Sequence, residues 1–167
     1  MRSEITLYSE DITLINIEER NLKSNNYSKY IFEIQNKGIS KIHVKLLIKL
    51  NFSDEIIGYI LSYNYDITNG YIFLDYQLNE KYINKYLNTV IHLFCNYLYI
   101  CFPIRKIYYE LCVEKPENYI DFLNKSGFVQ EACLKKDTFF NNNYLDKYIF
   151  SLSTIQKSLL NQTSKKT

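Results

Sequence analysis

The sequence predicts an α/β (α+β) fold: a mixed, twisted sheet of six or seven strands with helices on both faces and a parallel pair at the centre. Three observations support this. Segments between residues 42 and 78 have the composition of three consecutive strands, with an Asn69-Gly70 turn before the last. An apolar stripe at helical spacing follows directly. A further strand comes after that helix, so the helix is a crossover and the strands that it joins run parallel.

The first third predicts a short strand at residues 4–8 and then helical segments. Ile12 and Ile15 recur at a helical interval, and Ser9 or Asp11 could supply the N-cap oxygen. The polar stretch 25–40 contains Gly38 and predicts a further helical piece that ends in a loop. We therefore expect helices between the first strand and the meander.

The middle of the chain predicts an antiparallel meander followed by a long helix. Apolar residues alternate along the first strand of the meander, as expected for a half-solvated strand: Ile42, Val44, Leu46, Ile48 and Leu50. The helix is expected from Asn84 to Cys101, before Pro103. Its apolar stripe, which must pack on the sheet, consists of Ile83, Leu87, Val90, Ile91, Phe94 and Leu98.

The remaining segments predict a strand, a short helix and two final strands. The strand covers residues 105–114. Pro116 suits the first turn of the helix and Gly127 its C-terminal cap. We expect a single domain at 1–153 and a polar tail at 154–167.

Composition narrows the range of functions. The net charge of +2 argues against nucleic acid or a membrane as partner, and no apolar run is long enough to span a bilayer. The four cysteines form no CxxC pair and have no histidine at metal-ligand spacing, so we expect no metal site and a reducing, cytoplasmic location.

Two stretches resemble the GNAT (general-control-related N-acetyltransferase) superfamily, and specifically its branch that acetylates ribosomal-protein N-termini. They are "IIGYILSYNYDITNGYIFLDYQLNEKY" and "FLNKSGFVQEACLKKDTFFNNNYLDKYIFSLS". The second contains Gly127-Phe128, Gln130-Glu131 and a final strand with Asp146. The resemblance implies an acetyl-CoA or other acyl-CoA donor. The acceptor would be an amine of a small molecule, a peptide or a protein N-terminus.

The resemblance also implies where the donor binds. In the family it lies between the two parallel strands, with its pyrophosphate on the amides at the start of the intervening helix. The family motif Gln/Arg-x-x-Gly-x-Gly/Ala aligns with residues 82–87, where Lys85 and Leu87 fill both glycine positions. Lys85 could compensate with charge, whereas Leu87 cannot, so the site is either weakened or lost. The expected cofactor-binding residues are Leu78, Asn79, Tyr82, Ile83, Asn84, Lys85, Tyr86, Leu87 and Asn118.

Two residues are candidates for proton transfer. Family members often have a catalytic Glu near the position of Phe73, and Asp75 shares that strand face, so it is the candidate base. The family's acid Tyr aligns with Leu123, and Tyr119 lies one helical turn earlier. Either residue could instead be structural. Two functions therefore stay open: an acyl-CoA-dependent N-acyltransferase, or a degenerate GNAT-fold binding module without acyl transfer. A second copy of the chain is a further candidate partner.

Overall fold

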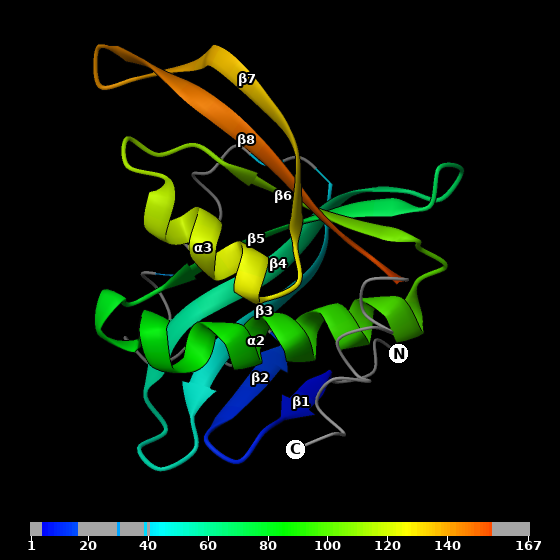
Figure 1. The fold of residues 1–167 in the computed structure, drawn as a ribbon. Helices are drawn as coiled ribbons and strands as arrows, with labels where there is room; N and C mark the ends of the chain where they lie inside the picture. The colour runs from blue at the N-terminus through cyan, green and yellow to red at the C-terminus, as the bar shows by residue number, and fades with distance from the viewer. Residues whose placement is uncertain (1–4, 17–29, 31–38, 40, 155–167) are drawn as a thin grey trace. The chain divides into compact units, whose positions relative to one another are not determined.

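The computed structural model describes residues 5–16, 30, 39 and 41–154, which form one eight-stranded sheet with two helices (Figure 1). The strand order is β1-β2-β3-β4-β5-β6-β8-β7, and β5 and β6 form the parallel pair. The predicted fold class is therefore confirmed. The chain groups into two compact units, residues 1–65 with 74–101 and residues 66–73 with 102–167. The single domain expected at 1–153 stays a prediction.

The first unit combines antiparallel strands with the long helix. Its elements are β1 (Thr6–Tyr8), β2 (Ile12–Asn16), β3 (Ile42–Leu50), β4 (Ile56–Asp66), the end of β5 (Tyr71–Leu78) and α2 (Glu80–Cys101). Strands β1 to β4 pair antiparallel in sequence order. Of the three strands expected to form the meander, β3 and β4 pair antiparallel and β5 is the next strand in the sheet.

Strand β2 corrects the prediction for the first third. Ile12 pairs with Leu50 and Asn16 with Leu46, so this segment is a strand and the helix predicted from the Ile12–Ile15 spacing is wrong. Ile12 and Leu14 are fully buried, because alternate side chains of a strand share one face. Pairing with β3 therefore outweighs the weak helical spacing, and it adds a strand to the six or seven expected.

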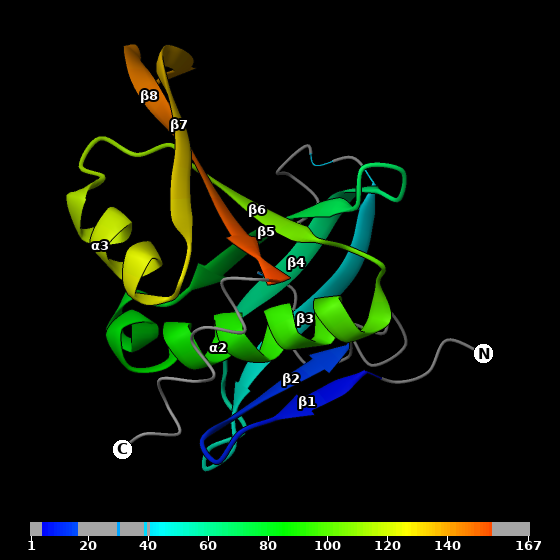
Figure 2. The same cartoon turned by 45° about the vertical axis from the view of Figure 1, so that its right-hand side comes forward.

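Helix α2 lies across the antiparallel strands of this unit (Figure 2). Its apolar stripe is buried as predicted. Leu87, Val90, Ile91, Phe94 and Leu98 are each at most 1% exposed. Ile83 is half-buried. The helix begins at Glu80, four residues before the predicted start at Asn84. The motif positions 82–87 therefore lie inside the first turns of the helix.

A second cluster of apolar residues forms elsewhere in this unit, around Leu47, Ile56, Tyr59 and Leu61. Tyr30 and Ile39 pack against it, and the Tyr30 and Tyr59 rings meet edge to face at 6.3 Å. Apart from these two residues, the helical piece expected at 25–40 lies outside the described residues.

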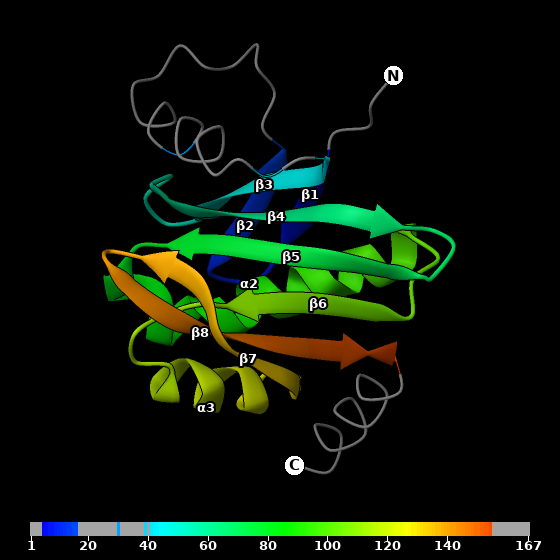
Figure 3. The same ribbon diagram turned by 90° about the horizontal axis from the view of Figure 1, so that it is seen from above.

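The second unit contains β6 (Lys106–Leu111), α3 (Glu117–Lys125), β7 (Val129–Phe140) and β8 (Asn143–Ser153). Strand β8 lies between β6 and β7 and runs antiparallel to both (Figure 3). The buried core of the second unit includes Ile107, Leu111, Phe128 and Phe150. Gly127 has φ of 87° and its amide bonds to Asn124 O, so the predicted C-terminal cap of α3 is confirmed. Within the described residues, neither helix has the length and apolarity needed to cross a membrane.

Candidate functional site

The end of β5 is held tightly against β4. A Cβ atom built on Gly58 would lie 2.1 Å from the Gln77 carbonyl oxygen and 2.9 Å from Leu78 Cα. The Tyr59 hydroxyl donates to Gln77 Oε1 at 3.1 Å, and the Asn79 amide donates to Ile57 O at 2.9 Å. Only glycine permits this approach, so Gly58 fixes the backbone from which α2 starts.

The first amides of α2 bond within the chain. Asn79 is the N-cap: its Oδ1 accepts from the Lys81 amide at 3.3 Å and its backbone oxygen from the Tyr82 amide at 2.9 Å. With the Asn79 amide on Ile57 O, three of the four amides at the helix start already have acceptors. An incoming phosphate would have to replace the Asn79 oxygens.

The motif positions inside α2 divide between core and surface. Leu87 and Tyr86 are 1% and 3% exposed, so both belong to the core. Asn84 and Lys85 are exposed, and Tyr82 and Ile83 are half-buried. Position 87, which is a glycine or alanine in the family motif, is therefore occupied here by a core leucine. The start of α2 therefore exposes the side chains of Asn84 and Lys85 to solvent.

Two lysines bring positive charge to the start of α2. Lys85 Nζ lies 4.8 Å from the centre of the Tyr86 ring, and Lys81 Nζ lies 4.4 Å from the centre of the Tyr82 ring. Hydrogen bonding to Tyr86, and then the charge of Asp11, raises the pKa of Lys85 above its ordinary value. The pKa of Lys81 is raised by Tyr82 and then by Glu55. Both side chains are therefore cations at neutral pH.

The carboxylate of Glu55, in the β3–β4 turn, contacts Lys81 and its neighbour Tyr82. Glu55 Oε2 accepts from the Tyr82 hydroxyl at 2.9 Å, and Glu55 Oε1 lies 3.8 Å from Lys81 Nζ. Sequence reasoning missed Glu55, because nothing in the local pattern connects residue 55 with residue 82. It also missed Gly58, although an isolated glycine inside a strand pattern is a recognised signal of close backbone approach.

The two predicted proton-transfer residues belong to different units. Asp75 is half-buried on β5 in the first unit, three residues before Leu78. Tyr119 lies on α3 in the second unit and is 38% exposed, while Leu123, one turn later, is 1% exposed. Asn118 is exposed beside Tyr119. The roles of all three residues stay predictions.

Aromatic rings surround Phe73, at the position where family members carry a Glu. The Phe73 ring lies 5.9 Å from that of Tyr71 and 5.4 Å from that of Tyr108, centre to centre. All three side chains are half-buried. This position therefore contributes an apolar surface and no proton acceptor.

A polar network in the second unit joins three strands. Glu131 Oε1 accepts from Lys106 Nζ and, at 2.7 Å, from Ser151 Oγ. The hydrogen bond from Lys106 lowers the pKa of the Glu131 carboxyl most, and the bond from Ser151 lowers it further. Glu131 lies at a bulge between Gln130 and Ala132, which turns it toward β8 and β6. The network stabilises the packing of β7 on its neighbours. Among the described residues, no group of three His, Cys, Asp or Glu side chains could hold a metal ion.

Comparison with known proteins identifies the fold. No family model and no curated protein sequence matches the chain. Solved structures do match. A GCN5-related N-acetyltransferase from Brucella melitensis gives a TM-score of 0.75 at 14% identity, over 96% of this chain and 83% of that one.

Two further structures are similar over most of both chains. The spermidine/spermine N-acetyltransferase SpeG from Vibrio cholerae gives a TM-score of 0.69 at 19% identity, covering 91% of this chain and 96% of that one. RimL, a ribosomal L7/L12 alpha-N-protein acetyltransferase solved with coenzyme A, gives 0.68 at 13% identity, covering 89% and 98%. The resemblance seen in the sequence thus extends to the backbone, and the chain has the fold of the GNAT N-acetyltransferases.

Proposed function

We propose that the protein is an acyl-CoA-dependent N-acyltransferase that transfers an acetyl group to an amine. The observation that carries the proposal is the fold, which the chain shares along nine-tenths of its length with acetyltransferases such as SpeG. The neighbours' names include a polyamine acetyltransferase and a protein N-terminal acetyltransferase. Both acceptor classes, a small-molecule amine and a peptide or protein N-terminus, are therefore candidates.

The side chains at the start of α2 suit a diphosphate better than its amides do. Lys81 and Lys85 are exposed cations one turn apart, and the helix dipole adds positive potential at the same end. The amides bond to Asn79 and Ile57 instead. We propose that the two lysines hold the donor phosphates, with Asn79, Tyr82 and Asn84 around them.

The donor supplies an activated thioester, and this chain's residues would position the amine and move its proton. The amine nitrogen bonds to the acyl carbon, the carbon–sulfur bond breaks, and the thiolate takes up a proton. Asp75 would accept the proton that the amine loses, directly or through water. The Leu78 amide would polarise the acyl oxygen. Much of the acceleration would come from holding the reactants together.

A second function is favoured by two observations. Leu87 is a core residue and the helix amides are engaged within the chain, so the backbone features that bind pyrophosphate in the family are reduced. A GNAT-fold binding module that no longer transfers acyl groups would show the same features.

A transfer assay distinguishes the two functions. The protein is incubated with isotope-labelled acetyl-CoA and a panel of polyamines and peptides with free N-termini, and products are identified by mass spectrometry. The N-acyltransferase predicts labelled amide that depends on protein concentration. The binding module predicts none above the uncatalysed rate with any acceptor.

A further inference from the structure

We propose that Glu55 sets the affinity of the protein for its acyl donor, because its carboxylate contacts Tyr82 and Lys81 at the start of α2. This inference rests on the proposed function, since it concerns the site proposed to hold the donor phosphates. It makes Glu55 a positioning residue that acts through Tyr82 and Lys81.

The first observation is the contact itself. The Glu55 carboxylate accepts a hydrogen bond of 2.9 Å from the Tyr82 hydroxyl and lies 3.8 Å from Lys81 Nζ. Tyr82 aligns with the first position of the pyrophosphate motif of the family that the sequence resembles, and Lys81 precedes it. An anion from the chain itself is therefore bound where an anionic ligand is proposed to bind. The Glu55 and Lys81 side chains are 44% and 60% exposed, so a ligand can reach both.

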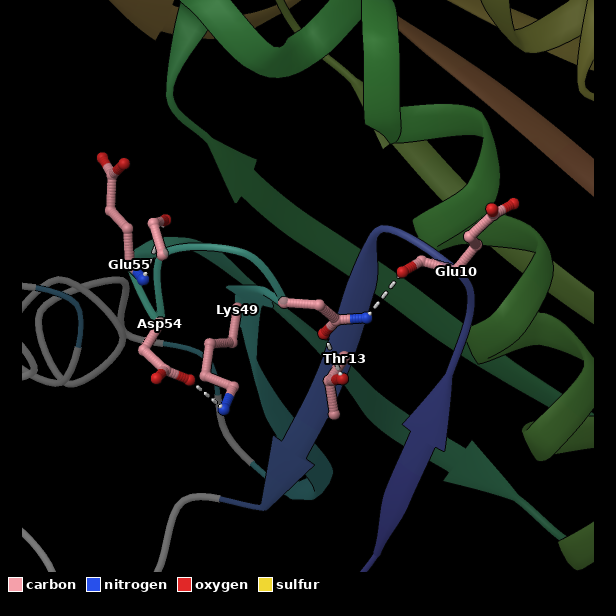
Figure 4. Close-up of polar contacts among 7 residues, drawn as sticks. Glu10, Thr13, Lys49, Asp54 and Glu55 are labelled. Carbon is pink, nitrogen blue, oxygen red and sulfur yellow. Dashed lines mark hydrogen bonds and ion pairs between the residues drawn. The ribbon is translucent and has the colours of Figure 1, made fainter.

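The second observation is that the turn carrying Glu55 is anchored. Asn51 Nδ2 donates to Ser9 O and Glu10 O at 3.0 Å each, and Thr13 Oγ1 donates to Asn51 Oδ1 at 2.6 Å. Figure 4 draws the bonds to Glu10 and Thr13 as dashed lines. The same turn forms an ion pair of 2.6 Å between Lys49 and Asp54. The bonds of Asn51 fix the turn to β2 and to the β1–β2 turn. Glu55 can therefore leave the start of α2 only by rotation of its own side chain.

The position of Glu55 implies electrostatic repulsion between its carboxylate and the phosphates of a bound donor. A diphosphate at Lys81 and Lys85 would bring negative charge next to the Glu55 carboxylate, and like charges at such distances repel even near solvent. The carboxylate would also have to give up Tyr82 and Lys81. Wild-type protein should therefore bind the donor more weakly than a variant without this charge.

The chain offers a matched control for the test. Asp54 is the neighbouring acid in the same turn, and Figure 4 shows it turned toward Lys49 while Glu55 extends away from that pair. Glu55→Gln and Asp54→Asn each remove one negative charge and keep the side-chain shape. A difference between them reports the position of Glu55 and not the net charge of the protein.

The experiment measures the Kd of acetyl-CoA by calorimetry, and KM and kcat for transfer, in both variants and the wild type. We expect Glu55→Gln to lower Kd and KM by about tenfold with kcat unchanged, and the gain to shrink as salt is added. Glu55→Lys should lower Kd further. Asp54→Asn should behave as wild type. Inorganic pyrophosphate, used as a competitor, should show the same order of affinities.

The outcomes separate this inference from the function on which it rests. If wild type binds acetyl-CoA and Glu55→Gln binds it no better than Asp54→Asn does, Glu55 has no such role while the proposed function stands. If no variant binds acetyl-CoA at millimolar concentration, the proposed function falls and this inference with it. Saturable binding by all three proteins, with Glu55→Gln tighter than both wild type and Asp54→Asn, would support the inference.

Discussion

The backbone of Gly58 lies so close to Gln77 that a Cβ atom at residue 58 would be 2.1 Å from the Gln77 carbonyl oxygen. That contact fixes where β5 ends and α2 begins, because the atoms in the way belong to the backbone and cannot rotate aside. Gly58→Ala must push the two strands apart, and we expect it to lower the free energy of unfolding by about 1–3 kcal/mol or more.

Urea unfolding of Gly58→Ala and Gly70→Asn measures this effect. Gly70 has φ of 66°, a conformation that Asn tolerates. Gly70→Asn should therefore lower the free energy of unfolding much less than Gly58→Ala does. An unchanged midpoint for Gly58→Ala would show that β4 can move away from β5 without loss.

The stripe of α2 gives a second stability prediction. Phe94 is fully buried and Ile100 on the same helix is 82% exposed. Phe94→Ala should cost about 3–5 kcal/mol, because it removes a large side chain from a packed core. Ile100→Ala should stay within about 0.5 kcal/mol of wild type. Equal effects in chemical denaturation would mean that the stripe does not form the core of this unit.

The lowered pKa of Glu131 predicts that the stability of the protein depends on pH. Its pKa is lowered in the folded protein, first by Lys106 and then by Ser151, from an ordinary value of 4.5. A carboxyl of this kind stabilises the fold above its unfolded-state pKa, and the stabilisation disappears as pH falls through the folded-state pKa. Wild type should therefore exceed Glu131→Gln in stability at neutral pH and lose that advantage as pH falls below the ordinary value.

Thermal unfolding at several pH values tests the Glu131 prediction. Glu114→Gln removes the same charge from an exposed position and serves as the control. An advantage of wild type over Glu131→Gln that persists in acid would assign the effect to something other than ionisation of this carboxyl.

Asp75 and Tyr119 carry the prediction about chemistry. If Asp75 accepts the amine proton, Asp75→Asn should lower the rate of acyl transfer at least about tenfold, and Tyr119→Phe should have a smaller effect. The measurement is steady-state transfer from about pH 6 to 9 with an acceptor that the assay has identified. Full activity in both variants would assign the proton transfers to solvent and leave Asp75 as a structural carboxylate.

How much of this fold the sequence could predict depends on the strength of each local pattern. The alternation from Ile42 to Leu50 and the stripe from Leu87 to Leu98 are long and regular, and both elements are present. Strand β2 has five residues, and its Ile12–Ile15 spacing of three fits a helix, whereas its Ile12–Leu14 spacing of two fits a strand. Its identity depends on pairing with β3, which is distant in sequence and leaves no local signal.

The candidate site shows the same limit. Asn79 and the residues after it could be identified from the resemblance, but the helix start at Glu80 moves positions 82–87 into regular helix. The contact of Glu55 with Tyr82 joins residues that are 27 apart in the chain. Such contacts depend on the tertiary fold, and no spacing rule predicts them.

The most direct test of the central claim is a calorimetric titration of acetyl-CoA into wild type and Lys85→Ala. Lys85 is an exposed cation at the start of α2 and takes no part in the core, so its loss should leave the fold intact. We predict saturable binding by wild type, a Kd several-fold higher for Lys85→Ala, and a difference that diminishes with added salt. Absence of binding by wild type at millimolar acetyl-CoA would contradict the claim that this protein uses an acyl-CoA donor.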